Sequence, residues 1–198
     1  MLLTKLHKPP VTNEHVYRES LIEYLEQNRY KPCTLVAAPA GYGKSMLISS
    51  WLDRSKYPFA WISLSKDDGD FSLFLNCINV AIRKTFPESL SNFNMLLDAA
   101  ETPPFKVIEE TLINDLDEIN KDFVLVLDDY HLIKNPEIHQ LVKSLISENL
   151  SNLQVVIITR WDPPFQLREL RLYQKMLELR MRDLRFDKSE IHELLSTA

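Results

Sequence analysis

The sequence predicts an α/β fold, a three-layer α/β/α sandwich around a mainly parallel five-stranded sheet. Apolar segments typical of strands alternate with segments whose apolar residues recur at helical spacing. The strand segments 123–127 and 153–159 are apolar on both faces, as parallel strands covered by helices on both sides are. The chain has only 3 glycines, and two of them, Gly41 and Gly43, are separated by a single residue directly after the first strand segment. Glycine is needed where the backbone turns with positive φ or approaches a ligand closely.

Composition places the chain among ordinary globular domains. It has 198 residues, 45% of them hydrophobic and 26% charged, which suits one domain. A formal net charge of −5 argues against a protein that coats nucleic acid. Cys33 and Cys77 lie in unrelated contexts, so we expect buried thiols in a reducing compartment. There is no apolar run typical of a signal peptide or of a membrane span, so we expect a cytoplasmic protein without a membrane partner.

The elements follow in order along the chain. The apolar helix face is best defined between Phe71 and Ile82, where apolar residues fall at i, i+3, i+4, i+7 and i+11. Segment 66–70 is expected to be a solvated turn, and segment 87–104 to be irregular. The predicted strands are 33–38, 59–64, 123–127, 153–159 and 176–179. The predicted helices are a lead helix before residue 30, then 44–52, 71–82, 108–119 and 136–146, and a last helix opened by an Asp187–Glu190 capping box. Helix 136–146 is expected to have Asn135 as its N-cap and Pro136 as its first residue.

A phosphate-binding loop is predicted after the first strand. AAPAGYGKS, residues 37–45, matches G-x-x-x-x-G-K-[ST] except that Ala38 stands at the first glycine, and it lies between a strand and a helix as the motif requires. Lys44 is expected to bridge the outer phosphates and Ser45 to offer its hydroxyl to Mg²⁺. The alternative is a tight turn that carries a stray Lys-Ser pair. The predicted nucleotide-binding residues of this loop are Pro39, Ala40, Gly41, Tyr42, Gly43, Lys44, Ser45 and Met46.

Two further strand ends carry charged residues. Asp128 and Asp129 end a buried strand, where unpaired carboxylates are costly and a cation would relieve the cost. We expect Asp128 to share Mg²⁺ with Ser45 and Asp129 to orient the attacking water; a solvated strand end is the alternative. Arg160 follows the next strand, and we expect it to sense the γ-phosphate rather than to be a merely exposed arginine.

Two weaker candidates receive structural interpretations. His131 is expected to form a structural hydrogen bond rather than to act in catalysis. The basic segment 168–188 also contains acidic residues, so a solvated or domain-contacting face is favoured over nucleic-acid binding.

Taken together, APAGYGKS, LVLDDYHLI (125–133), ITRWDPP and LELRMRDLRF (177–186) resemble the ATPase domain of MalT-like regulators. These are LuxR-type, ATP-dependent transcriptional activators of the STAND class of P-loop NTPases, related to AAA ATPases. The resemblance covers nearly the whole chain, and in this family a non-glycine residue commonly stands where Ala38 does. It implies the roles given above for Lys44, Ser45, Asp128, Asp129 and Arg160, and places Arg18 beside the nucleotide.

The resemblance also implies a function. It predicts a switch domain that is ADP-bound at rest and ATP-bound and self-associating after induction, with slow hydrolysis. DNA binding would belong to a C-terminal domain that is not in these residues. Residues 1–186 would form the nucleotide-binding domain, including its lead helix, and 187–198 the truncated start of a helical lid region. Two alternatives stay open: a P-loop kinase acting on a small metabolite, with the arginines after Arg168 as a lid, and a degenerate scaffold that binds no nucleotide.

Overall fold

The central sheet has five parallel strands in the order β2-β3-β4-β1-β5. The computed structural model describes residues 3–11, 16–148, 150–188 and 190–191. The strands are β1 (Cys33–Ala37), β2 (Phe59–Ser63), β3 (Phe123–Asp128), β4 (Leu153–Thr159) and β5 (Met176–Arg180). The predicted parallel sheet is therefore confirmed, and each predicted strand agrees with the observed one to within one residue at each end.

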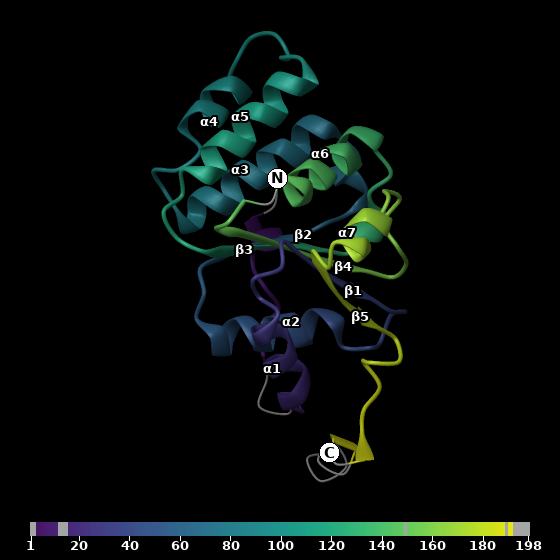
Figure 1. Ribbon diagram of the computed structural model, residues 1–198. Helices are drawn as coiled ribbons and strands as arrows, with labels where there is room; N and C mark the ends of the chain where they lie inside the picture. The colour runs from purple at the N-terminus through teal and green to yellow at the C-terminus, as the bar shows by residue number, and fades with distance from the viewer. Residues whose placement is uncertain (1–2, 12–15, 149, 189, 192–198) are drawn as a thin grey trace.

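Helices cover both faces of the sheet and complete the three predicted layers (Figure 1). The lower layer in that view contains α1 (Glu19–Gln27) and α2 (Lys44–Ser55). The upper layer contains α3 (Phe71–Thr85), α4 (Ser91–Leu97), α5 (Phe105–Asp117) and α6 (Pro136–Ser147). The short helix α7 (Arg168–Leu172) precedes β5, and the 3₁₀ turns are η1 (Leu3–Leu6), η2 (Lys66–Gly69) and η3 (Tyr130–Leu132).

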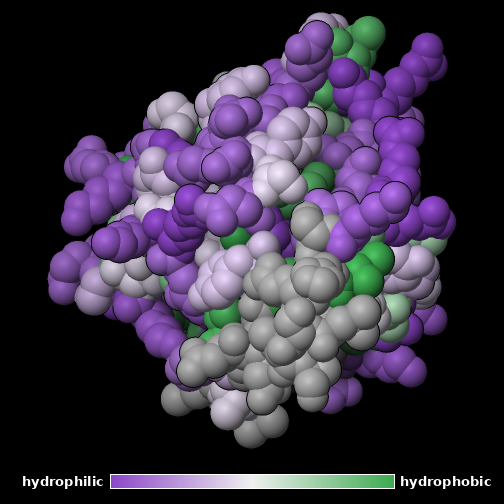
Figure 2. Space-filling model, turned by 90° about the horizontal axis from the view of Figure 1, so that it is seen from below, coloured by the Kyte–Doolittle hydropathy of each residue, from purple (hydrophilic) through white to green (hydrophobic). Residues whose placement is uncertain are grey.

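The strands feed two separate apolar cores because successive side chains point to opposite faces. In β1, Leu35 packs into the core beneath α3–α6, whereas Val36 packs into the core against α1 and α2. Val155 and Val156 of β4 divide in the same way. Burial on both faces explains why these strands read as continuous apolar runs. Seen from the α1 and α2 side, the coloured part of the surface is mostly hydrophilic with small hydrophobic areas (Figure 2).

Two predicted helix starts are confirmed by their caps. The side chain of Asn135 accepts a 2.9 Å hydrogen bond from the backbone N–H of Glu137, with Pro136 as the first helical residue of α6. Near the C-terminus, Asp187 and Glu190 accept each other's backbone N–H at 2.8 and 2.9 Å, which is the predicted capping box. Both thiols, Cys33 and Cys77, are buried as expected, and neither takes part in a disulfide.

The expectation of an irregular segment at 87–104 was wrong, because α4 lies within it. This short helix begins after Leu90, which has left-handed backbone geometry and gives no side-chain cap. Its support comes from α5: the carboxylate of Asp115 accepts 2.8 Å hydrogen bonds from the backbone N–H of Phe93 and the side chain of Asn92. Phe93 is fully buried. Tertiary contacts, which local sequence does not reveal, therefore hold this helix.

The turn expected at 66–70 is present as η2, but its Asp68 is buried and not solvated as expected. Asp68 is buried and forms a 2.9 Å salt bridge with Lys5 near the N-terminus. It also accepts 2.7 Å hydrogen bonds from the backbone and hydroxyl of Ser65. Asp70 caps α3 by accepting from the backbone N–H of Leu73 at 2.9 Å.

Within the described ranges, no helix is both long enough and apolar enough to pass through a bilayer.

Candidate functional site

The loop between β1 and α2 has the backbone conformation that its glycines predict. Gly41 has φ of 87° and Gly43 has φ of 68°, and Gly43 is the N-cap of α2. A Cβ placed on either glycine would meet no atom within 4 Å, so positive φ rather than crowding requires glycine here. Ala38 is buried, and its N–H donates to the carbonyl of Thr159 at 3.3 Å. The alanine therefore continues the pairing of β1 with β4 into the loop.

Lys44 folds back over the loop. Its Nζ donates a 2.9 Å hydrogen bond to the carbonyl of Pro39, five positions earlier. Burial lowers the pKa of Lys44, and the carboxylates of Asp129 and Asp128 oppose that shift. The ammonium group is thus held at the mouth of the loop with two carboxylates close by. This is the position from which it could contact the outer phosphates of a nucleotide.

Ser45 and Asp128 meet, although 83 positions separate them. The Ser45 hydroxyl donates a 2.9 Å hydrogen bond to Oδ1 of Asp128. The same oxygen accepts from the backbone N–H of Asp129 at 2.9 Å. Burial raises the pKa of Asp128 to about 6, against the opposing effect of the Ser45 hydrogen bond. A buried carboxylate of this kind favours either a proton or a cation.

The oxygen donors suit Mg²⁺, although protein groups alone do not enclose it. Across the described residues, no cluster of three or more His, Cys, Asp or Glu side chains is suited to hold a metal ion. Mg²⁺ is usually bound through one or two carboxylates together with substrate phosphates and water. Ser45 and Asp128 supply such a partial set.

Asp129 and His131 lie next to the Ser45–Asp128 pair. Asp129 has left-handed backbone geometry with φ of 56°, and its side chain is 52% exposed. His131 Nδ1 lies 3.8 Å from Asp129 Oδ1 and forms no hydrogen bond with a described residue. The predicted structural hydrogen bond is therefore not found at this nitrogen. Instead, the imidazole packs edge-to-face on Trp161 with ring centroids 5.1 Å apart, and burial lowers its pKa.

Arg160 lies close to this group and has no partner among the described residues. It directly follows Thr159 at the end of β4 and is exposed. Its positive charge contributes to the lowered pKa of Lys44 and of His131, behind burial in both cases. Within the part of the chain that the structure describes, its guanidinium makes no hydrogen bond or ion pair. The structure thus brings Lys44, Ser45, Asp128 and Arg160 to the carboxyl ends of the strands, where parallel sheets bind ligands.

Arg18 has a different environment from the loop residues. It is buried, and its guanidinium donates to the carbonyls of Leu184 and Arg185, each at 2.8 Å. It also forms a 3.1 Å ion pair with Glu190 and lies 4.9 Å from the ring centroid of Phe186. These contacts occupy the side chain with the C-terminal segment, so its predicted place beside the nucleotide stays a prediction.

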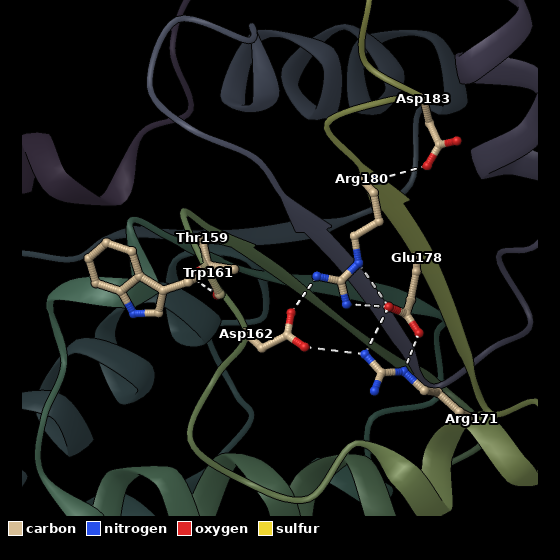
Figure 3. A network of polar contacts seen from close by, with 7 residues as sticks. All are labelled: Thr159, Trp161, Asp162, Arg171, Glu178, Arg180 and Asp183. Atoms are coloured by element: carbon tan, nitrogen blue, oxygen red, sulfur yellow. Dashed lines mark hydrogen bonds and ion pairs between the residues drawn. The ribbon is translucent and has the colours of Figure 1, made fainter.

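Four charged residues beside the site form a network of ion pairs, which the sequence did not predict (Figure 3). Asp162 and Glu178 each bind both Arg171 and Arg180. Sequence reasoning predicted only a mixed-charge face for segment 168–188. The alternation of Glu178 and Arg180 on one strand, which places both on one face, was the available signal.

Comparisons with known proteins show which sequences and structures this chain is similar to. No protein-family model matches the chain. The HTH-type transcriptional regulator MalT of Vibrio parahaemolyticus is 30% identical over 187 residues, which are 94% of this chain and 21% of that protein. MalT of Klebsiella pneumoniae strain 342 is 30% identical over 192 residues, 96% of this chain and 21% of that protein. The chain therefore spans about a fifth of the length of these curated relatives.

A solved structure confirms the fold. The crystal structure of Cdc6p from Pyrobaculum aerophilum superposes on the whole of this chain and on 53% of its own, with a TM-score of 0.61 and 14% identity. This likeness concerns the fold alone. Together with the glycine loop and the parallel sheet, it identifies the P-loop NTPase architecture.

Proposed function

We propose that this chain, a relative of the MalT-type transcriptional regulators over nearly its whole length, is a nucleotide-binding switch domain that takes ATP or ADP with Mg²⁺. The observation that carries the proposal is the 2.9 Å contact between Ser45 and Asp128 beside a glycine-dependent loop. Residues 1–186 would form this domain, and 187–198 would begin the helical region that follows it.

The residues divide the work of holding the nucleotide. The backbone N–H groups of loop 39–46 would bind the phosphates, and Lys44 would contact the outer ones. Ser45 and Asp128 would hold Mg²⁺, which neutralises phosphate charge when bound. Asp129 would orient the attacking water. Arg160, which forms no ion pair with any described residue, would contact the γ-phosphate.

Hydrolysis should be slow and switching incomplete in this chain. Asp129 is one methylene shorter than the glutamate that often activates water in motor-type relatives. Turning a 1:99 equilibrium into 99:1 needs about 5.5 kcal/mol of differential binding. A charged hydrogen bond from Arg160 to a γ-phosphate contributes about 1.5–3 kcal/mol. Nucleotide-gated self-association and DNA binding are therefore proposed only for a longer protein, with this chain as its nucleotide-binding part.

Titration with fluorescent ATP in the presence of Mg²⁺ tests the proposal. The unmodified chain should bind, and Lys44→Ala should lose most of that affinity. Lys106→Ala is the matched control, because Lys106 is exposed on α5 and forms an ion pair with the exposed Glu110. Binding that is absent from the unmodified chain, or equal in both variants, would favour the scaffold without nucleotide.

The phosphotransferase alternative receives no support from the arginines. Arg171 and Arg180, which would belong to a lid over the donor phosphates, are bound to Asp162 and Glu178. Phosphoryl transfer to metabolites in a coupled assay would nevertheless revive that alternative.

A further inference from the structure

The segment that carries Arg160 is fastened on both sides of that residue. Before it, β4 ends with Thr159 in register with Ala37, next to the glycine loop. Thr159 Oγ1 donates a 2.8 Å hydrogen bond to the carbonyl of Trp161. After it, the carboxylate of Asp162 has both oxygens bound, Oδ1 by Arg180 and Oδ2 by Arg171. Arg160 thus lies on a short, restrained bend, and its side chain has no partner within the part of the chain that the structure describes.

The restraint is anchored to β5 and α7. Glu178 accepts from Arg171 at 2.7 Å and from Arg180 Nε at 2.9 Å, so it binds the same two guanidinium groups as Asp162 (Figure 3). The backbone N–H of Arg180 donates to Asp183 at 2.8 Å, which fixes the end of β5 as well. In the close view, Asp162 points toward the two arginines and Trp161 points away from them.

The charges of this network cancel within it. Two carboxylates face two guanidinium groups, and Arg180 lies in register with Ala37 at the end of the neighbouring strand. Hydrogen bonds from Arg180 are the main cause that holds the pKa of Asp162 below its usual range. Isolated exposed ion pairs contribute little, but a network with two-point guanidinium contacts restricts geometry more strongly. Such a network suits positioning better than anion binding.

We propose that Asp162 is a positioning residue that, through its ion pairs with Arg171 and Arg180, directs the neighbouring Arg160 toward the γ-phosphate of bound ATP. The proposal rests on the nucleotide-binding function proposed above. ADP lacks the γ-phosphate, so Asp162 should act on ATP affinity and leave ADP affinity nearly unchanged.

The test compares the affinities for MgATP and MgADP by calorimetry in Asp162→Asn and in the unmodified chain. Asp162→Asn should reduce the ratio of ATP to ADP affinity by about tenfold, the size expected for one charged hydrogen bond. In an Arg160→Ala background, the same substitution should change the ratio by less than about twofold, because the group that it positions is absent. Glu110→Gln, which removes an exposed carboxylate from an ion pair on α5, is the matched control.

The outcomes separate this inference from the proposed function. Equal losses for ATP and ADP, an effect that persists without Arg160, or a wild-type chain that binds both nucleotides equally would overturn the positioning role. Absence of Lys44-dependent binding would instead overturn the nucleotide function itself. The affinity ratio is insensitive to a reduced folded fraction; if Asp162→Asn does not fold, Asp162→Glu, which keeps the charge and shifts the carboxylate by one methylene, should show a partial loss of the ratio.

Discussion

The Ser45 hydroxyl and the Asp128 carboxylate form a 2.9 Å hydrogen bond across the carboxyl ends of two strands that are not neighbours. This contact joins the first turn of α2 to the end of β3. A hydroxyl and a carboxylate already in contact need only small movements to share a cation.

Removing the Ser45 hydroxyl should abolish the metal dependence of binding. In Ser45→Ala, ATP affinity with Mg²⁺ should fall by about tenfold toward the affinity in EDTA, because one metal ligand is lost. Ser55→Ala is the control, since Ser55 lies at the other end of α2 and its hydroxyl donates to the Leu52 carbonyl. Unchanged Mg²⁺ stimulation in Ser45→Ala would contradict the assigned role.

Asp128→Asn should stabilise the nucleotide-free protein near neutral pH. The folded-state pKa of about 6 exceeds the ordinary value of 3.8, so the folded protein binds the proton more tightly. The contribution of this group to stability is present below about pH 4 and is lost as pH rises through about 6. Asparagine retains Oδ1 as the acceptor for Ser45 and for the Asp129 N–H.

Thermal unfolding at several pH values checks this prediction. The gain in unfolding free energy should reach at most about 3 kcal/mol at pH 8 and disappear near pH 4, since two units of pKa correspond to roughly that energy. Asp122→Asn, at an exposed carboxylate, should show no such pH dependence. A destabilised Asp128→Asn at pH 8 would show that burial of the charge is not the dominant effect.

Gly43→Ala should destabilise the fold through backbone geometry alone. Gly43 has φ of 68° with open space around it, so the cost is that of a left-handed alanine, about 1–2 kcal/mol. Gly69→Ala is the matched control, because Gly69 has equal space and no positive φ. Urea denaturation should separate the two variants; equal midpoints would mean that the loop relaxes at no cost.

Asp129→Asn should slow hydrolysis far more than it weakens binding. Loss of a group that orients and polarises water typically lowers the rate by about 10²–10⁴-fold. ATP affinity should change by less than about threefold, because the exposed Asp129 side chain is not assigned to the phosphates. Single-turnover measurements with excess enzyme report the chemical step directly. Parallel losses of rate and affinity would reassign Asp129 to binding.

Breaking the Arg18–Glu190 pair should destabilise the chain strongly. Both side chains are at least nine-tenths buried, so Arg18→Ala leaves a buried carboxylate without its cation. The expected loss in unfolding free energy is about 3–5 kcal/mol. Arg54→Ala removes an exposed ion pair with Glu19 and should cost no more than about 1 kcal/mol. Similar losses in the two variants would show that burial of the pair is not important.

Local patterns were sufficient to predict the sheet and the glycine loop. β4 was predicted to the residue because its apolar, β-branched run 155–158 is flanked by residues that mark the ends of the strand. The loop was predicted because its chemistry needs glycine, lysine and serine at fixed spacing. The loop motif and the acidic end of β3 led us to expect Ser45 and Asp128 at one Mg²⁺ site, and the structure brings their side chains to 2.9 Å.

Features that depend on residues distant in the sequence could not be predicted from local patterns. The helix α4 depends on Asp115 of α5, and burial of Asp68 depends on Lys5, which is 63 positions away. The contacts of Arg18 lie more than 160 positions along the chain. Spacing within a sequence window carries no information on such pairings, because it describes only neighbours along the chain.

The strand order determines which strands can change in length without moving the proposed site. β4 lies between β1, which leads into the glycine loop, and β3, which ends in Asp128. Inserting or deleting a residue in β4 would shift Arg160 by one side-chain position and turn it toward the opposite face. The edge strand β2 carries none of these groups, so its length should vary more freely among natural or engineered variants.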